Sequence, residues 1–169
     1  MRKILGRKTS SNVMKLLWGC AELGLEYERE DIGGPFGGND QPEFLALNPN
    51  GRVPVLIEED FVLWESNAIL RYLASAHGQG TLWPTNAQVR ARAERWMDWQ
   101  LSILSPALVP VFWGYVRTPE AERDYAKLNA ARDVLEDDMV MVDRYLGETA
   151  YLGGETFSMG DIPVGIAAF

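Results

Sequence analysis

The chain has one cysteine and one histidine in 169 residues, and this scarcity excludes several kinds of chemistry. A lone thiol, Cys20, cannot form an internal disulfide and is typical of a reducing compartment, so we expect a cytoplasmic protein. Cys20 and His77 lie at unrelated places and cannot together build a metal site, so we expect no metal cofactor. No C-x-x-C pair is present, which disfavours thioredoxin-type disulfide exchange.

Basic residues and long apolar runs are also scarce. The 16 Lys and Arg residues stand against 24 Asp and Glu residues, a net charge of −8. This balance argues against nucleic acid or an anionic membrane surface as a partner. No apolar run is long enough to span a bilayer, and the start of the chain lacks the apolar core of a signal peptide. The composition, 47% apolar, is that of one or two small globular domains.

Residues 48–56 carry the most informative motif in the chain. Residues 49–51, Pro-Asn-Gly, predict a reversal of the chain, and the apolar run at 55–57 predicts a strand. Pro54 stands at the entrance of that strand, which makes the Val53-Pro54 bond the best candidate for a cis peptide. A cis bond would turn the backbone groups of Val53 toward an extended, peptide-like ligand. The alternative is a plain loop-to-strand proline.

A second motif follows one hairpin later. Residues 61–64 predict another strand after an acidic turn, and the apolar spacing beyond it predicts a helix that begins near Ser66. Glu65 and Ser66 would therefore lie at a helix N-terminus, where the backbone N–H groups and the helix dipole favour an anion. Ser66 either binds such an anion or simply caps the helix.

These two motifs at this spacing resemble the glutathione transferase family. The resemblance, to the cytosolic, serine-type and theta-like bacterial members, covers nearly the whole chain. It implies that the backbone of Val53, beside cis-Pro54, pairs with the cysteinyl part of glutathione. It also implies that Glu65 and Ser66 hold the γ-glutamyl end. Arg52 either lies near the glycine carboxylate or is a solvated loop charge.

The order of elements agrees with that fold. A strand, a helix and a second strand within the first 32 residues predict a parallel βαβ unit. With the later helix, hairpin and final helix, residues 1–78 read as a β-α-β-α-β-β-α domain of thioredoxin-like fold, the glutathione-binding domain of the family. Residues 77–84, with two glycines and a proline, predict a linker. Residues 86–169 then predict an all-helical domain.

Within that helical domain the pattern predicts a long helix over residues 87–116 that Pro106 and Pro110 kink or break. Thr118 is the expected N-cap of a second helix that runs to about Leu146. Ser158 and Asp161 predict a capping box at the start of a third helix. The sequence ends within this apolar helix, at Phe169, while the family usually continues. We therefore expect a truncated or naturally short chain.

The resemblance implies a chemistry that needs the glutathione thiol as a thiolate. A thiol pKa near 8.5 must fall by about two units, which requires roughly 2.7 kcal/mol of preferential thiolate stabilisation. In serine-type members a hydroxyl in the turn before the first helix donates to the sulfur. Ser10 fits this position best, counting back from the helix end at residues 23–24, and Ser11 is the alternative. Either serine, or Asn12, could instead be the N-cap. Cys20 lies on the apolar face of that helix and reads as a packing residue.

We therefore predict a glutathione S-transferase that conjugates glutathione, its co-substrate, to a small apolar electrophile. Phe112, Trp113 and Tyr115 are candidate walls of the electrophile pocket, or else core residues. The resemblance also implies a homodimer. The rival functions are a glutathione-dependent isomerase, dehalogenase or peroxidase on the same scaffold, and a non-catalytic glutathione-binding module, because a fold does not decide a chemistry.

Overall fold

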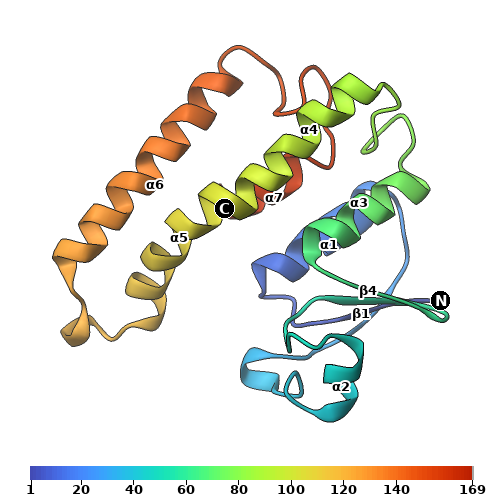
Figure 1. Cartoon of the computed structure of the whole chain (residues 1–169), viewed down its shortest axis with the longest axis horizontal. Helices are drawn as coiled ribbons and strands as arrows, with labels where there is room; N and C mark the ends of the chain where they lie inside the picture. Colours follow the sequence, from blue (N-terminus) through green and yellow to red (C-terminus); the bar gives the residue numbers. More distant parts are fainter. Residues whose placement is uncertain (169) are drawn as a thin grey trace. The chain divides into compact units, whose positions relative to one another are not determined.

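In the computed structural model, which describes residues 1–168, the chain forms two compact units, Met1–Thr85 and Asn86–Phe169 (Figure 1). The first unit is an α/β domain whose order of elements is the predicted β-α-β-α-β-β-α. Its elements are β1 (Arg2–Leu5), α1 (Ser11–Glu22), β2 (Glu28–Glu30), a 3₁₀ turn (Gly34–Phe36), α2 (Pro42–Leu47), β3 (Val55–Glu58), β4 (Phe61–Trp64) and α3 (Ser66–His77).

The four strands form one sheet in the order β2-β1-β3-β4. β1 and β2 are parallel, as the βαβ unit predicts, and both β1–β3 and β3–β4 are antiparallel. Successive residues of a strand point to opposite faces of the sheet. Ile4 and Leu56 therefore belong to one core cluster, and their neighbours Leu5 and Val55 to another.

The first of these clusters lies under α1 and α3, which cover one face of the sheet, while α2 covers the other (Figure 1). Val13, Leu16 and Cys20 of α1 are fully buried in it, which confirms the predicted apolar face and the packing role of Cys20. α1 approaches α3 closely at Gly19. A Cβ atom there would lie only 2.5 Å from Cδ1 of Leu70, so the close packing of the two helices depends on this glycine.

The long helix of the second unit is continuous, so of the two outcomes predicted for its prolines, a kink or a break, the break is wrong. It consists of α4 (Ala87–Trp99), a π-helical segment (Gln100–Leu104), α5 (Ser105–Phe112) and a second π-helical segment (Trp113–Arg117). The residues at every junction keep right-handed helical backbone angles. Pro106 has no N–H to donate and its ring crowds the preceding turn. A π-helical segment ends at Leu104, two residues before this proline, so the pattern of backbone hydrogen bonds changes just ahead of Pro106.

The next helix, α6 (Tyr125–Leu146), begins later than predicted. Thr118 does not cap it. Both its backbone N–H and its hydroxyl donate to the carbonyl of Trp113, at 2.9 and 3.1 Å, so Thr118 ends the preceding helix instead. A short 3₁₀ turn (Glu120–Glu122) follows, and Asp124 is the N-cap, accepting a hydrogen bond from the backbone N–H of Lys127.

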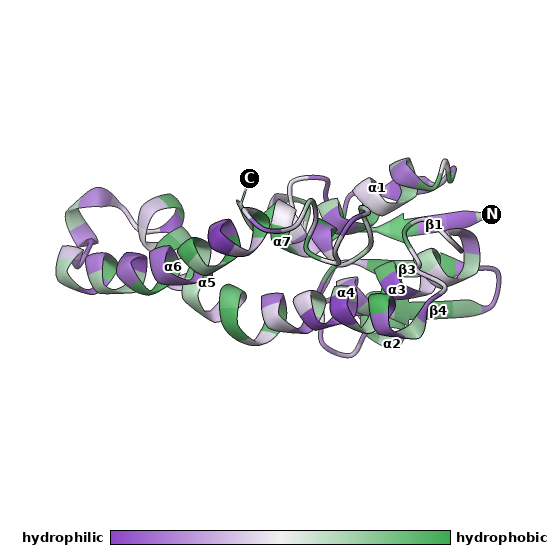
Figure 2. Ribbon diagram, turned by 90° about the horizontal axis from the view of Figure 1, so that it is seen from above, coloured by the Kyte–Doolittle hydropathy of each residue, from purple (hydrophilic) through white to green (hydrophobic). Residues whose placement is uncertain are grey.

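α6 is amphipathic, and Figure 2 shows hydrophilic and hydrophobic residues alternating along it. Leu128 and Val142 are buried, whereas Leu146, the last residue of the helix, is exposed. Within residues 1–168, no helix combines the length and the apolar composition needed to cross a membrane.

The final helix, α7 (Asp161–Ala168), begins at the predicted capping box; Phe169 lies outside the described residues. The carboxylate of Asp161 accepts hydrogen bonds from the backbone N–H and the hydroxyl of Ser158, at 2.9 and 3.0 Å. It also accepts one from the backbone N–H of Leu152, at 2.7 Å. All three residues are buried. Asp161 thus joins the loop that follows α6 to the first turn of α7.

Replacing Asp161 by alanine should destabilise the protein. The change leaves three buried donors without an acceptor, so we expect the free energy of unfolding to fall by about 2–4 kcal/mol. Urea denaturation, followed by circular dichroism, measures this loss. The matched control is Asp137→Ala on the exposed face of α6, for which we expect a change below about 0.5 kcal/mol. Equal effects of the two substitutions would contradict the role assigned to Asp161.

Candidate functional site

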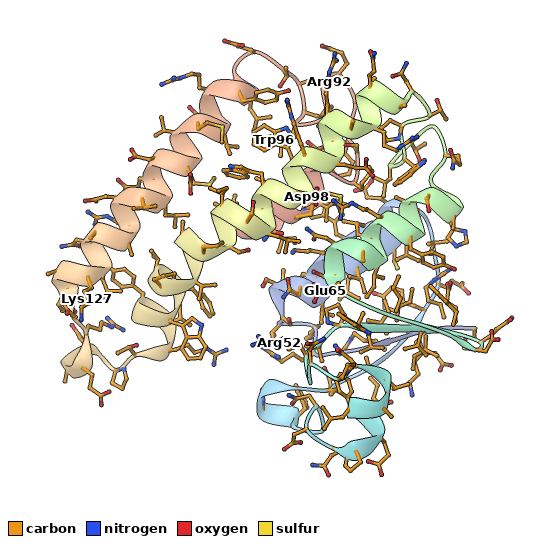
Figure 3. The ribbon with its side chains drawn as sticks, viewed as in Figure 1. Arg52, Glu65, Arg92, Trp96, Asp98 and Lys127 are labelled. Atoms are coloured by element: carbon orange, nitrogen blue, oxygen red, sulfur yellow. The ribbon has the colours of Figure 1, made fainter. Side chains whose placement is uncertain are left out.

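The register of the sheet gathers the predicted glutathione-binding residues at one end. Leu5, the last residue of β1, pairs with Val55, and Val55 pairs in turn with Trp64, the last residue of β4. The turn after β1, the residues before β3 and the start of α3 therefore meet at the same edge. Figure 3 shows two labelled members of this group, Arg52 and Glu65, at the end of the sheet where α3 begins.

Val53 presents its backbone at this edge. The Val53-Pro54 peptide bond is cis, as predicted, and Pro54 is buried immediately before β3. Within residues 1–168, neither the N–H nor the C=O of Val53 takes part in a hydrogen bond. The side chain of Val53 lies against Gly6, where a Cβ atom would come within 3.0 Å of it. The side chain is therefore packed while the two backbone groups remain available to a ligand.

The turn before Val53 is held by Asn48, a residue whose role the sequence did not reveal. The side chain of Asn48 is buried, and its amide nitrogen donates to the backbone carbonyl of Arg52 at 2.7 Å. Its oxygen accepts from the backbone N–H of Asn50 at 3.0 Å. This is the local side-chain-to-backbone bonding that favours asparagine in turns. Arg52 itself is exposed.

Glu65 and Ser66 lie at the N-terminus of α3, as predicted. Glu65 is the N-cap, is exposed, and has a backbone φ of 74°, a left-handed conformation that side chains rarely adopt. Ser66 is the first residue inside the helix and is buried, so the alternative that it caps the helix is wrong. Its hydroxyl donates instead to the side-chain oxygen of Asn12, at 3.3 Å, which joins the start of α3 to the start of α1.

The two candidate serines before α1 differ in environment. Ser10 is the N-cap of α1 and only 9% exposed, yet its hydroxyl makes no capping hydrogen bond. Ser11 is the first residue of the helix and is exposed. Asn12 lies inside the helix, so the alternative that it is the N-cap is wrong. The hydroxyl of Ser10 thus stands at the positive end of a twelve-residue helix without a capping role.

Lys15 is the residue of this region that the sequence reasoning missed. It lies on α1, is 1% exposed, and its ammonium group donates to Oγ of Ser66 at 3.4 Å and to Oδ1 of Asn67 at 3.1 Å. Burial lowers the pKa of Lys15 from 10.5 to about 8, although the charge of Glu65 acts in the opposite direction. The chain therefore keeps a cation inside its α1–α3 interface.

A signal for this residue exists in the sequence. Asn12, Lys15 and Gly19 are spaced by three and four residues, so they share one face of α1, and the glycine indicates close contact with another helix. Cys20, by contrast, is not a candidate nucleophile. Its thiol is fully buried, and that burial raises its pKa to about 11, so it stays protonated.

The glycine-rich loop at residues 33–38 packs on the turn that leads into α1, because the side chain of Arg7 lies against Gly33 and Gly34.

Phe112, Trp113 and Tyr115, the candidate walls of the electrophile pocket, belong to the second unit. All three are exposed there, Trp113 at 59%, and so none is a core residue of that unit. Among residues 1–168 no cluster of side chains has the composition of a metal site.

Comparison with known proteins identifies relatives over almost the whole chain. The family described as "Glutathione S-transferase, N-terminal domain" matches residues 3–75. Glutathione S-transferase GstB of Escherichia coli is 43% identical over 97% of this chain and 80% of its own length. Dichloromethane dehalogenase of Methylophilus leisingeri is 28% identical over 83% of this chain and 55% of its own length.

A similar structure has also been solved. It is a theta class glutathione S-transferase from the citrus canker pathogen Xanthomonas axonopodis pv. citri, with glutathione bound. It is 48% identical to this chain, superposes with a TM-score of 0.93, and is matched over 97% of this chain and 79% of that one.

The lowered pKa of Lys15 predicts a specific pH dependence of stability. Between about pH 8 and pH 10.5 the unfolded state holds this proton and the folded state does not, so the free energy of unfolding should rise with pH in that window. The gain should be at most about 3 kcal/mol. Urea denaturation of the wild type beside Lys15→Met, at pH 7.5 and pH 10, measures it, because other titrating groups cancel in the difference. A difference that stays flat or falls would contradict the pKa direction.

Proposed function

The chain belongs to the glutathione S-transferase family, and from that premise we propose that it conjugates glutathione to small electrophilic substrates. The observation that carries the proposal is the meeting of the free backbone of Val53 with the N-termini of α1 and α3 at one end of the sheet. A solved relative at 48% identity with glutathione bound supports it. The glutathione-binding domain then spans residues 1–78, and the all-helical domain residues 86–169.

In the proposed complex, each part of glutathione meets a group of matching chemistry. The unpaired N–H and C=O of Val53, beside Pro54, pair with the backbone of the cysteinyl residue. The N-terminus of α3 at Ser66 receives the γ-glutamyl carboxylate, and the exposed carboxylate of Glu65 receives the γ-glutamyl ammonium. Arg52 lies near the glycine carboxylate, with which its charge is complementary.

The proposed catalytic step begins with the glutathione thiol. Its proton leaves to solvent, and the hydroxyl of Ser10 donates a hydrogen bond that stabilises the resulting thiolate. The N-terminus of α1 adds a favourable dipole. The thiolate then attacks the electrophilic carbon, a C–S bond forms, and the leaving group departs with its electron pair. Ser11 remains the alternative donor, since it too lies in the first turn of α1.

The electrophile is an apolar molecule in this proposal. Phe112, Trp113 and Tyr115 supply its aromatic wall, since large exposed aromatic side chains grouped within four residues favour contact with an apolar ligand. The fold of the chain and its low cysteine content support a cytoplasmic location.

One relative favours a second candidate function. The dichloromethane dehalogenase suggests that the same thiolate could displace halide from a haloalkane, with the C–halogen bond breaking as the C–S bond forms. Halide release from dichloromethane, compared with conjugation of a chloronitroarene, decides between the two substrate classes. Tight glutathione binding without turnover of either substrate would favour an isomerase, a peroxidase or a non-catalytic binding module.

Removing the hydroxyl of Ser10 should slow conjugation without weakening glutathione binding. We expect Ser10→Ala to lower kcat/KM for a chloronitroarene at pH 7 by about 10- to 100-fold, because the thiol pKa rises again by one to two units. Spectrophotometric assay of conjugation gives the rate, and calorimetric titration with glutathione gives the affinity, which should stay within about twofold.

Ser11→Ala is the matched control, since it removes the neighbouring hydroxyl from the same turn. It should retain nearly the full rate. A loss confined to Ser11→Ala would assign the thiolate donor to Ser11 and overturn the assignment to Ser10. Loss of glutathione affinity in both variants would mean that these serines hold the ligand rather than activate its thiol.

We also propose that the protein is a homodimer, the state that the family resemblance implies through the region of α3 and the long helix that starts at Ala87. Exposed apolar side chains on this helix, Leu101 and Ile103, support the proposal. Size-exclusion chromatography with light scattering should give about twice the chain mass of 19.0 kDa. A mass that stays at 19.0 kDa up to high protein concentration would contradict it.

A further inference from the structure

Lys15 is a cation in a place where packing alone would favour an apolar side chain. Its neighbours along α1, Val13, Leu16 and Cys20, are buried and apolar, and Lys15 is itself 1% exposed. Removing an ammonium group from water is costly unless strong polar contacts replace its hydration. The lowered pKa of Lys15 reflects that cost, yet at about 8 it leaves the group mostly protonated at neutral pH. A buried charge retained under these conditions suggests a function beyond stability.

The contacts of Lys15 lead directly to the proposed binding site for the γ-glutamyl group. The ammonium group donates to the hydroxyl oxygen of Ser66, and that hydroxyl donates its one proton to Asn12. A ligand carboxylate at Ser66 would compete for this proton. Because a donor that itself accepts from a cation is polarised, Lys15 makes the Ser66 hydroxyl a stronger donor toward that carboxylate.

The charges around the N-terminus of α3 also favour a carboxylate at this place. The N-terminus of a helix carries about half a positive charge, and the ammonium group of Lys15 adds a whole one within hydrogen-bonding distance of the first two residues of α3. Glu65, exposed and immediately before α3, supplies the opposite charge. The start of α3 therefore has a cationic inner side and an acidic outer side. This is the charge pattern that complements the free amino-acid end of a γ-glutamyl group.

We infer that Lys15 is a specificity-determining residue: acting through Ser66, its buried charge selects ligands whose γ-glutamyl group keeps a free α-carboxylate. This inference rests on the proposed function, since it concerns the glutathione end of the same site. Lys15 does not touch the reacting sulfur, so it is a positioning residue and not a catalytic one. Its substitution should raise KM for glutathione while leaving kcat at saturating glutathione nearly unchanged.

The test uses two ligands that lack a free thiol, so that thiol ionisation does not enter. One is S-methylglutathione. The other is its analogue with a 4-aminobutyryl group in place of γ-glutamyl, which lacks only the α-carboxylate. Calorimetric titration gives the affinity of both ligands for the wild type, Lys15→Met and Lys15→Gln. We expect both variants to bind S-methylglutathione at least about tenfold more weakly, and the analogue within about twofold of the wild type.

Lys15→Gln separates charge from hydrogen bonding, because an amide can still donate to Ser66 and Asn67 but carries no charge. It also carries the test if Lys15→Met does not fold. Full affinity of Lys15→Gln for S-methylglutathione would overturn the role of the charge. Equal weakening of both ligands would show a structural role only and would also overturn the inference.

The matched control is Lys3→Met. Lys3 lies on β1 of the same unit, where it pairs with Glu30 at the surface. This variant loses the same charge and should bind both ligands within about twofold of the wild type. Failure of the wild type to bind S-methylglutathione at all would refute the proposed function itself, an outcome distinct from failure of the inference about Lys15.

Discussion

The pairing of β3 with β1 on one side and with β4 on the other is the constraint on which the candidate site depends. Through it, Val55 is joined to both Leu5 and Trp64, the last residues of their strands. Side chains alternate along a strand, so a register shift by one residue would turn the buried Ile4 and Leu56 away from their core. The core therefore fixes the register. The register in turn brings the turn before α1, the backbone of Val53 and the start of α3 to one edge.

The helices that cover this sheet combine apolar packing with a small polar cluster. Gly19 permits the close approach of α1 to α3, and the apolar side chains beside it provide the burial. At the N-terminal ends of the same two helices, Asn12, Lys15, Ser66 and Asn67 are linked by hydrogen bonds. Buried polar groups are tolerated only when partners satisfy them, so such a cluster also restricts how the helices are aligned. The part of the interface nearest the proposed ligand is thus the polar part.

The second unit shows how local rules are modified by neighbouring residues. Pro106 and Pro110 would each disrupt a regular α-helix, yet both lie within α5 and the helix continues through them, with a π-helical segment before α5 and another after it. Thr118 is a residue type that favours the N-cap position, but its hydroxyl and its backbone N–H both donate to the carbonyl of Trp113 at the end of the preceding helix. Asp161 accepts hydrogen bonds both from its own cap partner, Ser158, and from the loop at Leu152. The hydrogen bonds of these capping residues therefore join separate segments of the chain as well as marking where helices begin and end.

Local chemistry was enough to predict much of the fold and part of the site. Residues 48–56 and 61–66 contain the turn, the hairpin and the helix start, because each depends on neighbours in the chain. For the Val53-Pro54 bond, local chemistry left a cis and a plain loop-to-strand proline open, and the family resemblance implied the cis form. The order of elements and the apolar face of α1 followed from spacing in the same way. Tertiary structure alone decided that the hydroxyl of Ser10, the N-cap residue, makes no capping hydrogen bond, that Ser66 bonds to Asn12, and that Lys15 is buried. Each of these depends on groups more than fifty residues apart or on the packing of one helix against another, which the periodicity of a single segment does not encode.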